Sequence, residues 1–369
     1  MASVVIAPDK FKGVISAPAA ARAIATGVRR ARPDAEIIEL PMADGGEGTL
    51  EIIVEAMSGQ RRSVRATGPL GDPLEVPVGL VREATAAVIE LAAVSGYSLI
   101  PEERRDPLKT TTYGLGEVIR AAVETEIEEI ILALGGSATV DGGAGMMQAL
   151  GMTFYDADGR SLDAPLGGGN LSRIARVAWD RPPENLADVR FTIAVDVLNP
   201  ASGPNGAATV FGPQKGADAH GVALLEKGMT SWANVLERSA GRSIRNEPGT
   251  GAAGGVALPL LALLSAQIVP GVDLVCEANR LADRIGAADL VITGEGRLDR
   301  QSLMGKVVGA VARMARSVNV PCVAMVGATG EGAEECMHLL DDCITLDAPL
   351  PETERRLTEL AQQMAMEWI

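Results

Sequence analysis

A short glycine-rich loop, residues 135–143, carries the densest group of potential ligand-binding residues in the chain. It follows an apolar run of strand length, residues 130–134, and precedes a helix-like segment, residues 144–150. Glycines let backbone N–H groups approach a ligand, and the start of a helix favours an anion, so this arrangement is typical of phosphate binding. A tight turn without a ligand is the alternative. The candidate binding residues are Gly135, Gly136, Ser137, Thr139, Asp141, Gly142 and Gly143.

Carboxylates at two other strand ends suit a divalent cation or a substrate hydroxyl. Asp44 and Glu47 flank a glycine pair after the second predicted strand, and Asp196 follows the apolar run of residues 191–195. Glu47 is equally explained by the dipole of the helix that it begins, and Asp196 by a turn before Pro200. We predict catalytic roles for Asp44 and Asp196, and a Mg²⁺-ligand role for Asp44.

Charged residues also gather in the segment TGEGRLD, residues 293–299, which contains Glu295, Arg297 and Asp299, with Lys306 further on. Cations and carboxylates that alternate about a glycine suit phosphate and metal binding, whereas a surface salt-bridge cluster is the alternative. We predict that Glu295 and Lys306 bind substrate or nucleotide, that Glu295 is a second Mg²⁺ ligand, and that Arg297 is catalytic. Lys12, beside a glycine after the first strand, is the remaining catalytic candidate.

Three familiar site signatures are missing or out of context. GTGAAG, residues 249–254, matches G-x-G-x-x-G, but no strand precedes it and no acidic residue follows at a strand end, so it does not predict a dinucleotide site. No Walker G-x-x-x-x-G-K-[ST] motif occurs, so an ATP site must be of another design. Neither His220 nor His338 lies in a motif, and no Ser-His-Asp triad is predicted.

The elements that position these residues alternate between strand and helix at both ends of the chain. Strands are predicted over residues 3–7 and 36–40, with helices over residues 16–31, which Ser16 caps, and 47–57. The rhythm returns with strands over 288–293, 320–327 and 343–346, and helices over 307–317, 331–339 and 351–368. Five such units predict an α/β fold with a doubly wound parallel sheet of the flavodoxin-like order.

The middle of the chain follows another pattern, with short β-like pieces punctuated by glycine and proline from about Arg61. We therefore predict a flavodoxin-like domain of residues 1–62 and 286–369, and a second α/β domain, residues 63–285, inserted in it. Two consecutive domains divided near Gly151 are the alternative. In the flavodoxin-like order, the loop of residues 9–13 faces the loop of residues 294–306 at the switch point, where ligands bind.

Composition limits the possible functions. The chain has 369 residues, 47% of them hydrophobic, which is typical of a globular protein with two domains. Its net charge of -15 and its aromatic content of 3% argue against nucleic-acid binding. The same charge repels anionic substrates at long range, so local cations, backbone donors or a divalent cation must bind them.

Other features indicate a cytoplasmic protein without a membrane span. The N-terminal residues lack a basic region followed by a long apolar segment. The four cysteines show no C-x-x-C spacing, so reduced thiols are expected and a zinc site is not. Residues 251–272 are uncharged and approach the length of a membrane span, but their prolines and glycines favour a buried helix.

Eight strings along nearly the whole chain resemble the type-1 glycerate kinase family. One departure from the family pattern is Lys10, where a small polar residue, usually Ser, is expected; Lys12 is then the matching lysine. The strings are, in order, APDKFKG, PMADGGEGT, DPLKTTTYGLGEVI, GGSATVDGGAGMMQALG, DVLNP, VFGPQKGA, GTGAAGG and ITGEGRLDRQSLMGK.

The resemblance implies ATP-dependent phosphorylation of D-glycerate, with magnesium, by a two-domain protein with one domain inserted in the other. In this hypothesis Asp196 orients the substrate hydroxyl or accepts its proton, and Mg²⁺ near Asp44 and Glu295 screens the phosphates. Lys12, with Arg297 or Lys306, stabilises the transferring charge. The glycine loop of residues 135–143 is assigned to the triphosphate, although the carboxylate of glycerate would suit the same donors.

Several alternatives stay open. We expect phosphorylation at the 2-hydroxyl, with the 3-hydroxyl as the alternative. A dinucleotide-dependent oxidoreductase of a small hydroxy acid, and a sensor that binds such an acid without turnover, would use a similar sheet. The expected partners are small-molecule substrates, with neither nucleic acid nor membrane, and the expected assembly is a monomer or a homodimer.

Overall fold

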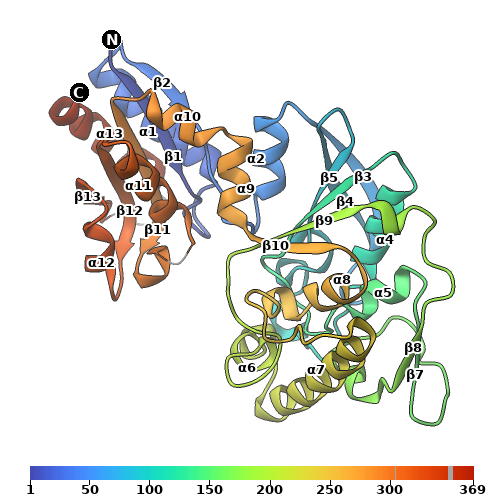
Figure 1. Ribbon diagram of the computed structural model, residues 1–369. Helices are drawn as coiled ribbons and strands as arrows, with labels where there is room; N and C mark the ends of the chain where they lie inside the picture. The colour runs from blue at the N-terminus through green and yellow to red at the C-terminus, as the bar shows by residue number, and fades with distance from the viewer. Residues whose placement is uncertain (304, 348–351) are drawn as a thin grey trace. The chain divides into compact units, whose positions relative to one another are not determined.

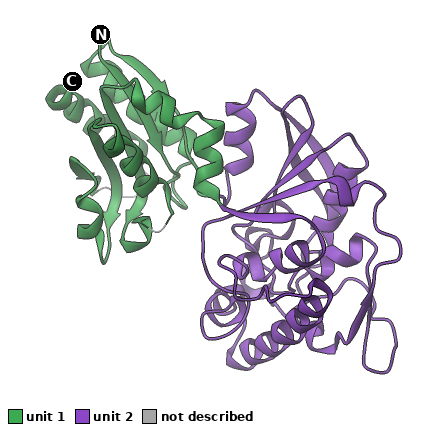
Figure 2. Ribbon diagram, in the orientation of Figure 1, with its two compact units in different colours: residues 1–44, 270–369 green, residues 45–269 purple. Residues whose placement is uncertain are grey.

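The computed structural model describes residues 1–303, 305–347 and 352–369 of the chain. It contains two compact units (Figure 1, Figure 2). The first unit combines Met1–Asp44 with Pro270–Ile369, and the second is the contiguous segment Gly45–Val269. The second unit is therefore inserted in the sequence of the first.

The first unit is built on a five-stranded sheet with the order β13-β12-β11-β1-β2. All of its pairings are parallel. Numbered along this unit, the strand order is 2-1-3-4-5, so the flavodoxin-like order is confirmed. The strands are β1 (Ser3–Pro8), β2 (Glu36–Glu39), β11 (Leu290–Leu298), β12 (Cys322–Thr329) and β13 (Asp342–Thr345).

Helices cover both faces of this sheet, because its strands carry apolar side chains on both sides. Val323 and Met325 of β12 pack with α1 and α13, whereas Ala324 and Val326 pack with α11 and α12. Ser16 caps α1 as predicted, since its Oγ accepts a hydrogen bond from Ala19 N at 3.4 Å. The helices are α1 (Ala17–Ala31), α9 (Gly271–Ala278), α10 (Leu281–Gly286), α11 (Val307–Ser317), α12 (Ala333–Met337) and α13 (Thr353–Trp368).

The second unit has a mixed six-stranded sheet with the order β10-β9-β6-β5-β4-β3. β3, β4 and β5 pair antiparallel, and β5, β6 and β9 pair parallel. A two-stranded antiparallel ribbon joins β7 (Thr153–Tyr155) and β8 (Arg176–Ala178). The strands of the sheet are β3 (Gln60–Thr67), β4 (Pro73–Val81), β5 (Ala86–Glu90), β6 (Glu129–Ala133), β9 (Arg190–Val195) and β10 (Ala266–Pro270).

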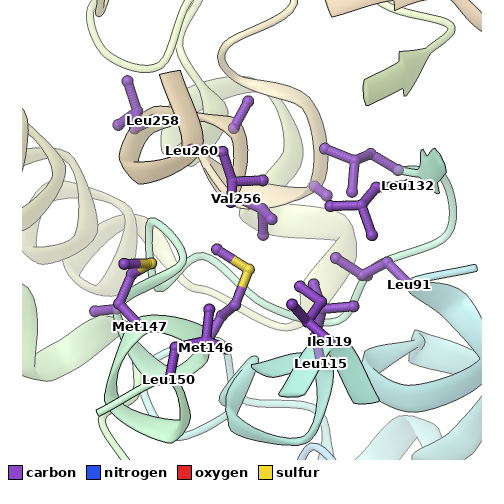
Figure 3. Packing of buried hydrophobic residues seen from close by; sticks show 14 of the residues in the cluster. Leu91, Leu115, Ile119, Leu132, Met146, Met147, Leu150, Val256, Leu258 and Leu260 are labelled. Carbon is purple, nitrogen blue, oxygen red and sulfur yellow. The ribbon is translucent and has the colours of Figure 1, made fainter. Parts of the chain in front are cut away.

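One large apolar core holds the second unit together, and Figure 3 shows part of it. Leu115 and Ile119 of α4 gather there with Leu132 of β6, Met146 of α5 and Val256. The helices are α2 (Thr49–Ala56), α3 (Ala92–Ser95), α4 (Tyr113–Val123), α5 (Ala144–Ala149), α6 (Ala207–Phe211), α7 (Ala219–Ala240) and α8 (Ala257–Leu263). Short 3₁₀ turns complete the two units: Tyr97–Leu99, Glu102–Arg104, Gly168–Arg173, Leu186–Asp188, Pro213–Lys215, Ala252–Gly254 and Arg300–Leu303.

The boundaries between the two compact units lie between residues 44 and 45 and between residues 269 and 270. The sequence analysis placed them at 62/63 and 285/286. At the first boundary, α2 packs against β4 and β5 of the second unit. A Cβ added to Gly79 of β4 would lie 2.4 Å from Val54 Cγ2 of α2, which shows how close this packing is. At the second boundary, α9 contacts α10, which packs against α11 of the first unit. Side-chain packing thus assigns α2 to the second unit and α9 and α10 to the first. Local composition does not reveal this assignment.

Two predicted elements differ in the structure. The single buried helix expected over residues 251–272 is divided into a 3₁₀ turn, α8, β10 and the start of α9. Gly254 and Gly255, with φ of +71° and +90°, interrupt the helical path. β11 continues to Leu298, so Glu295 and Arg297 lie in a strand and not in the predicted loop. None of the described helices is long and apolar enough to cross a membrane.

Candidate functional site

In the second unit, the glycine loop and Asp196 leave adjacent parallel strands at the same edge of the sheet. Ala133 of β6 is in register with Ala194 of β9, and Leu134 N donates a hydrogen bond to Ala194 O at 3.0 Å. Gly135 and Asp196 each lie two residues beyond this pair, just after the two strands, and neighbouring strands are only about 5 Å apart. The structure thus places two separately predicted candidates side by side.

The first part of the loop, residues 135–137, is a turn in which Gly135 and Gly136 are accessible and Ser137 is buried with an exposed fraction of 5%. Gly136 is exposed with φ of +66°, and its carbonyl accepts a hydrogen bond from Tyr97 N at 3.0 Å. Gly135 is half-buried, and a Cβ there would lie 2.5 Å from Gly46 Cα, so a glycine is required at this close approach. We call residues 135–137 the 135–137 turn.

Lys215, which the sequence analysis did not select, supports this turn from within the unit. Its Nζ donates hydrogen bonds to Ser137 Oγ at 2.7 Å and to Thr139 O at 2.8 Å, and its exposed fraction is 4%. Burial lowers the pKa of Lys215 to about 7, although the nearby Asp141 carboxylate opposes this shift. The only sequence signal for this role was its position in VFGPQKGA, far along the chain from the loop.

Asp141 has a structural role inside the second half of the loop. It is fully buried, and its carboxylate accepts hydrogen bonds from Thr112 N and Oγ1 at 2.8 and 2.7 Å. Gly143 N and Gly145 N donate to the same carboxylate at 3.2 and 3.3 Å. Burial raises the pKa of Asp141, and these hydrogen bonds oppose the shift. In this structure Asp141 therefore organises the loop, and its role as a ligand stays a prediction.

The helix start after the loop is also closed to an anion in this structure. Gly142 N donates to Gly254 O at 2.9 Å, and Gly142 O accepts from Trp232 Nε1 at 2.8 Å. Ala144 N donates to Asp141 O at 2.9 Å and Met146 N to Thr112 Oγ1 at 3.0 Å. The backbone donors at the start of α5 are thus satisfied within the protein. Thr139, Asp141, Gly142 and Gly143 are buried, as Ser137 is, and Thr139 Oγ1 has no hydrogen-bond partner among the described residues; their ligand roles stay predictions.

GTGAAG, residues 249–254, packs against both segments of this edge. Gly251 N donates to Asn199 O at 2.8 Å, just after Asp196, and a Cβ on Gly251 would lie 2.2 Å from Pro200 O. A Cβ on Gly254 would lie 2.1 Å from Thr139 O in the glycine loop. These glycines permit close backbone packing, which explains the motif without a dinucleotide.

The first unit has a separate group of carboxylates at the carboxyl ends of β1 and β11. Asp9 N donates to Gly294 O at 2.8 Å, which holds the end of β1 against β11. Burial, followed by the neighbouring Asp44, raises the pKa of Asp9 to about 7. Burial likewise raises the pKa of Glu295 to about 7, while a hydrogen bond with Ser302 opposes the shift. Asp9 therefore belongs to the same carboxylate group as Asp44 and Glu295, although the sequence analysis did not select it. The sequence signal that could have identified it is its position directly after the first strand.

The predicted cations of the first unit either follow β1 or lie near the end of β11. A Cβ on Gly296 would be 3.2 Å from Lys12 N, so the two loops predicted to face one another are in contact. The Lys12 side chain is exposed, and Lys306 precedes α11 as its N-cap residue. The guanidinium of Arg297 lies beside Gly330, because a Cβ there would be 2.7 Å from Arg297 Nε. Lys10 Nζ lies 3.9 Å from Asp44 Oδ1.

The residues predicted to bind Mg²⁺ fit an ion that also binds nucleotide phosphates. Among the described residues, no group of three His, Cys, Asp or Glu side chains is arranged to hold a metal by itself. Mg²⁺ usually takes only one or two protein carboxylates, with phosphates and water completing its coordination. Glu295 Oε1 is buried without a hydrogen-bond partner among the described residues, which suits a cation ligand.

The doubly wound sheet and the polar residues at its carboxyl edge define an α/β enzyme that binds its ligands at strand ends. Comparison with known proteins specifies the family. The model of the glycerate kinase family matches residues 4–368, and the chain belongs to this family. The resemblance found in the sequence is thereby confirmed, and the chain is a phosphotransferase with ATP as its co-substrate.

Individual relatives cover most of the chain. It is 41% identical over 374 residues to a glycerate kinase of Halalkalibacterium halodurans, covering 99% of this chain and 98% of that one. It is 42% identical over 324 residues to a glycerate 2-kinase of Escherichia coli, covering 88% and 84%. A crystal structure assigned to glycerate kinase 2 of Salmonella typhimurium LT2 has a TM-score of 0.86 and 40% identity, covering 99% of this chain and 98% of that one.

Proposed function

We propose that this protein transfers the γ-phosphoryl group of ATP to the 2-hydroxyl of D-glycerate, giving 2-phosphoglycerate and ADP. The observation that carries the proposal is the placement of Asp196 beside the 135–137 turn, in a chain whose relatives include a glycerate 2-kinase. A carboxylate and a set of hydrogen-bond donors are the groups that a hydroxy acid requires.

In the proposed reaction, Asp196 orients the 2-hydroxyl and accepts its proton. The hydroxyl oxygen forms a bond to the γ-phosphorus, while the bond between this phosphorus and the bridging oxygen of ADP breaks. Lys12, Arg297 and Lys306 are the candidate cations for the negative charge that leaves with ADP. Asp44 and Glu295 would hold Mg²⁺, which neutralises phosphate charge when it is bound.

The proposal is tested by ADP release from Mg-ATP and D-glycerate, with the product passed to enolase. Enolase accepts 2-phosphoglycerate but not the 3-isomer, so ADP release with enolase turnover is expected. ADP release without enolase turnover would assign the reaction to the 3-hydroxyl instead. A folded protein that releases no ADP under these conditions would contradict the proposed activity.

We further propose that the protein acts in the cytoplasm as a monomer or a homodimer. All four cysteines, Cys276, Cys322, Cys336 and Cys343, are unpaired in the structure, as thiols are in a reducing compartment. Light scattering of the purified protein would distinguish the two assemblies.

A further inference from the structure

We propose that the 135–137 turn, supported by Lys215, binds the carboxylate of the acceptor acid and not the triphosphate of ATP. This inference rests on the proposed function, and it decides between the two anions that the sequence left open for the glycine loop. Under this proposal, the acid binds at one edge of the sheet in the second unit.

The first step is the geometry of an α-hydroxy acid. Its carboxylate and its reactive hydroxyl are on adjacent carbon atoms, so the protein groups that bind them must lie only a few Å apart. Gly135 and Asp196 meet this requirement, because they follow adjacent strands joined by the hydrogen bond from Leu134 N to Ala194 O at 3.0 Å. With Asp196 on the hydroxyl, the carboxylate falls at the 135–137 turn.

The second step is the direction of the hydrogen bonds at Ser137. Lys215 Nζ donates to Ser137 Oγ in their 2.7 Å contact and to Thr139 O at 2.8 Å, so Ser137 Oγ is the acceptor in the first of these hydrogen bonds. The hydroxyl proton of Ser137 remains free to donate, and the described residues provide no acceptor for it. The hydrogen bond from Lys215 thus leaves the Ser137 hydroxyl as a donor for an anion, and the protonated form of Lys215 adds a positive charge behind the turn.

The third step is the charge at this edge. Glu90 is the last residue of β5 and Asp196 follows β9, so both strands beside β6 bring an acidic residue to this edge. Lys215 is the buried cation that supports the turn, and the backbone donors at the start of α5 bind other protein groups. One carboxylate matches these donors better than a triphosphate does. The three candidate cations for phosphate lie in the first unit.

Steady-state kinetics with the two substrates varied separately test this assignment. In Ser137→Ala and Lys215→Met, we expect the KM for D-glycerate to rise at least tenfold, because a charge-assisted hydrogen bond to the carboxylate is lost. The KM for ATP should stay within about twofold. Lys227→Met, which removes an exposed lysine of α7, is the matched control and should change neither constant.

Ser137→Ala is a small change, so it keeps the test decisive if Lys215→Met does not fold. A rise in the KM for ATP, alone or together with that for D-glycerate, would overturn the assignment, as would no change in either. If the wild-type protein releases no ADP, the proposed function fails by itself. Calorimetric titration with D-glycerate alone then tests the subsite, and equal affinity of wild type and Ser137→Ala would refute it.

Discussion

Two aspartates of the second unit, Asp141 and Asp196, follow neighbouring strands but have different surroundings. Asp141 is fully buried and accepts four hydrogen bonds from Thr112, Gly143 and Gly145, so it organises the loop. Asp196 is half-buried at the sheet edge beside Gly135. Burial thus distinguishes the structural carboxylate of Asp141 from the partly accessible carboxylate of Asp196.

This difference predicts the effect of Asp196→Asn. Asparagine keeps the shape of the side chain but is not a proton acceptor, so kcat should fall on the order of a hundredfold or more, with the thermal midpoint nearly unchanged. Asp158→Asn, which alters an exposed aspartate of the same unit, is the control and should leave kcat within about twofold. Near-normal turnover in folded Asp196→Asn would remove this residue from the mechanism.

The pKa of Lys215 predicts a pH dependence of stability. Burial lowers this pKa from 10.5 to about 7, so between these values the unfolded chain binds more protons than the folded protein. The free energy of unfolding should therefore rise with pH from about 7 towards 10, by up to about 1.4 kcal/mol per pH unit from this group. Urea titrations of wild type and Lys215→Met at several pH values isolate the contribution. Equal slopes in the two proteins would show that Lys215 keeps an ordinary pKa.

At the scale of elements, the loop of residues 249–254 connects two segments that carry candidate site residues. Its backbone contacts Asn199 and Pro200 after β9 on one side, and Thr139 and Gly142 of the glycine loop on the other. Close packing of this kind leaves no room for a side chain. The glycines therefore fix the position of both segments relative to one another within the second unit.

Gly254→Ala should destabilise the protein more than Gly241→Ala. Both glycines have a positive φ, +71° and +67°, so both alanines carry a similar backbone cost. Only at Gly254 would the new Cβ meet another atom, Thr139 O at 2.1 Å, whereas nothing lies within 4 Å at Gly241. We expect the overlap to cost about 1–3 kcal/mol beyond the shared term. Equal unfolding free energies in urea would disprove the packing role.

At the scale of the whole molecule, the two units have separate apolar cores, and only one of them is formed from a single continuous segment of the chain. The second unit is contiguous, but the first is formed from two segments separated by Gly45–Val269. A folded second unit fixes the distance between these segments' ends. When it unfolds, the first unit must close a flexible loop of this length, at a cost on the order of 5 kcal/mol.

Because only the first unit is discontinuous, core mutations in the two units should have different effects on unfolding. Ile292 of β11 and Ile193 of β9 are both fully buried in central strands of their sheets, so either change to alanine should cost about 2–5 kcal/mol. Ile292→Ala should lower the transition of the first unit alone, whereas Ile193→Ala should lower both. Replacing Trp368 of the first unit by phenylalanine leaves Trp179 and Trp232, so that fluorescence follows unfolding of the second unit alone. Circular dichroism follows unfolding of the whole protein. A fluorescence transition shifted by Ile292→Ala would show that the units unfold together.

The sequence by itself determined the local elements and the chemical types of the candidate residues. The strands before Asp9 and Asp196 and the cap at Ser16 follow from apolar periodicity and short-range hydrogen bonding, which depend on nearby residues. The alternation of strand and helix at both ends of the chain also indicated a parallel sheet, because parallel strands require such crossovers, and the observed strand order agrees with the predicted flavodoxin-like order.

Only the tertiary structure decided which candidates a ligand can reach. The hydrogen bond from Lys215 to Ser137 joins residues 78 positions apart, and no local pattern encodes it. The same applies to the burial of Asp141, to Asp9 beside β11, and to the assignment of α2 to the second unit. These features arise from close packing between distant segments, which fixes accessibility, hydrogen-bond partners and pKa values only once the chain is folded.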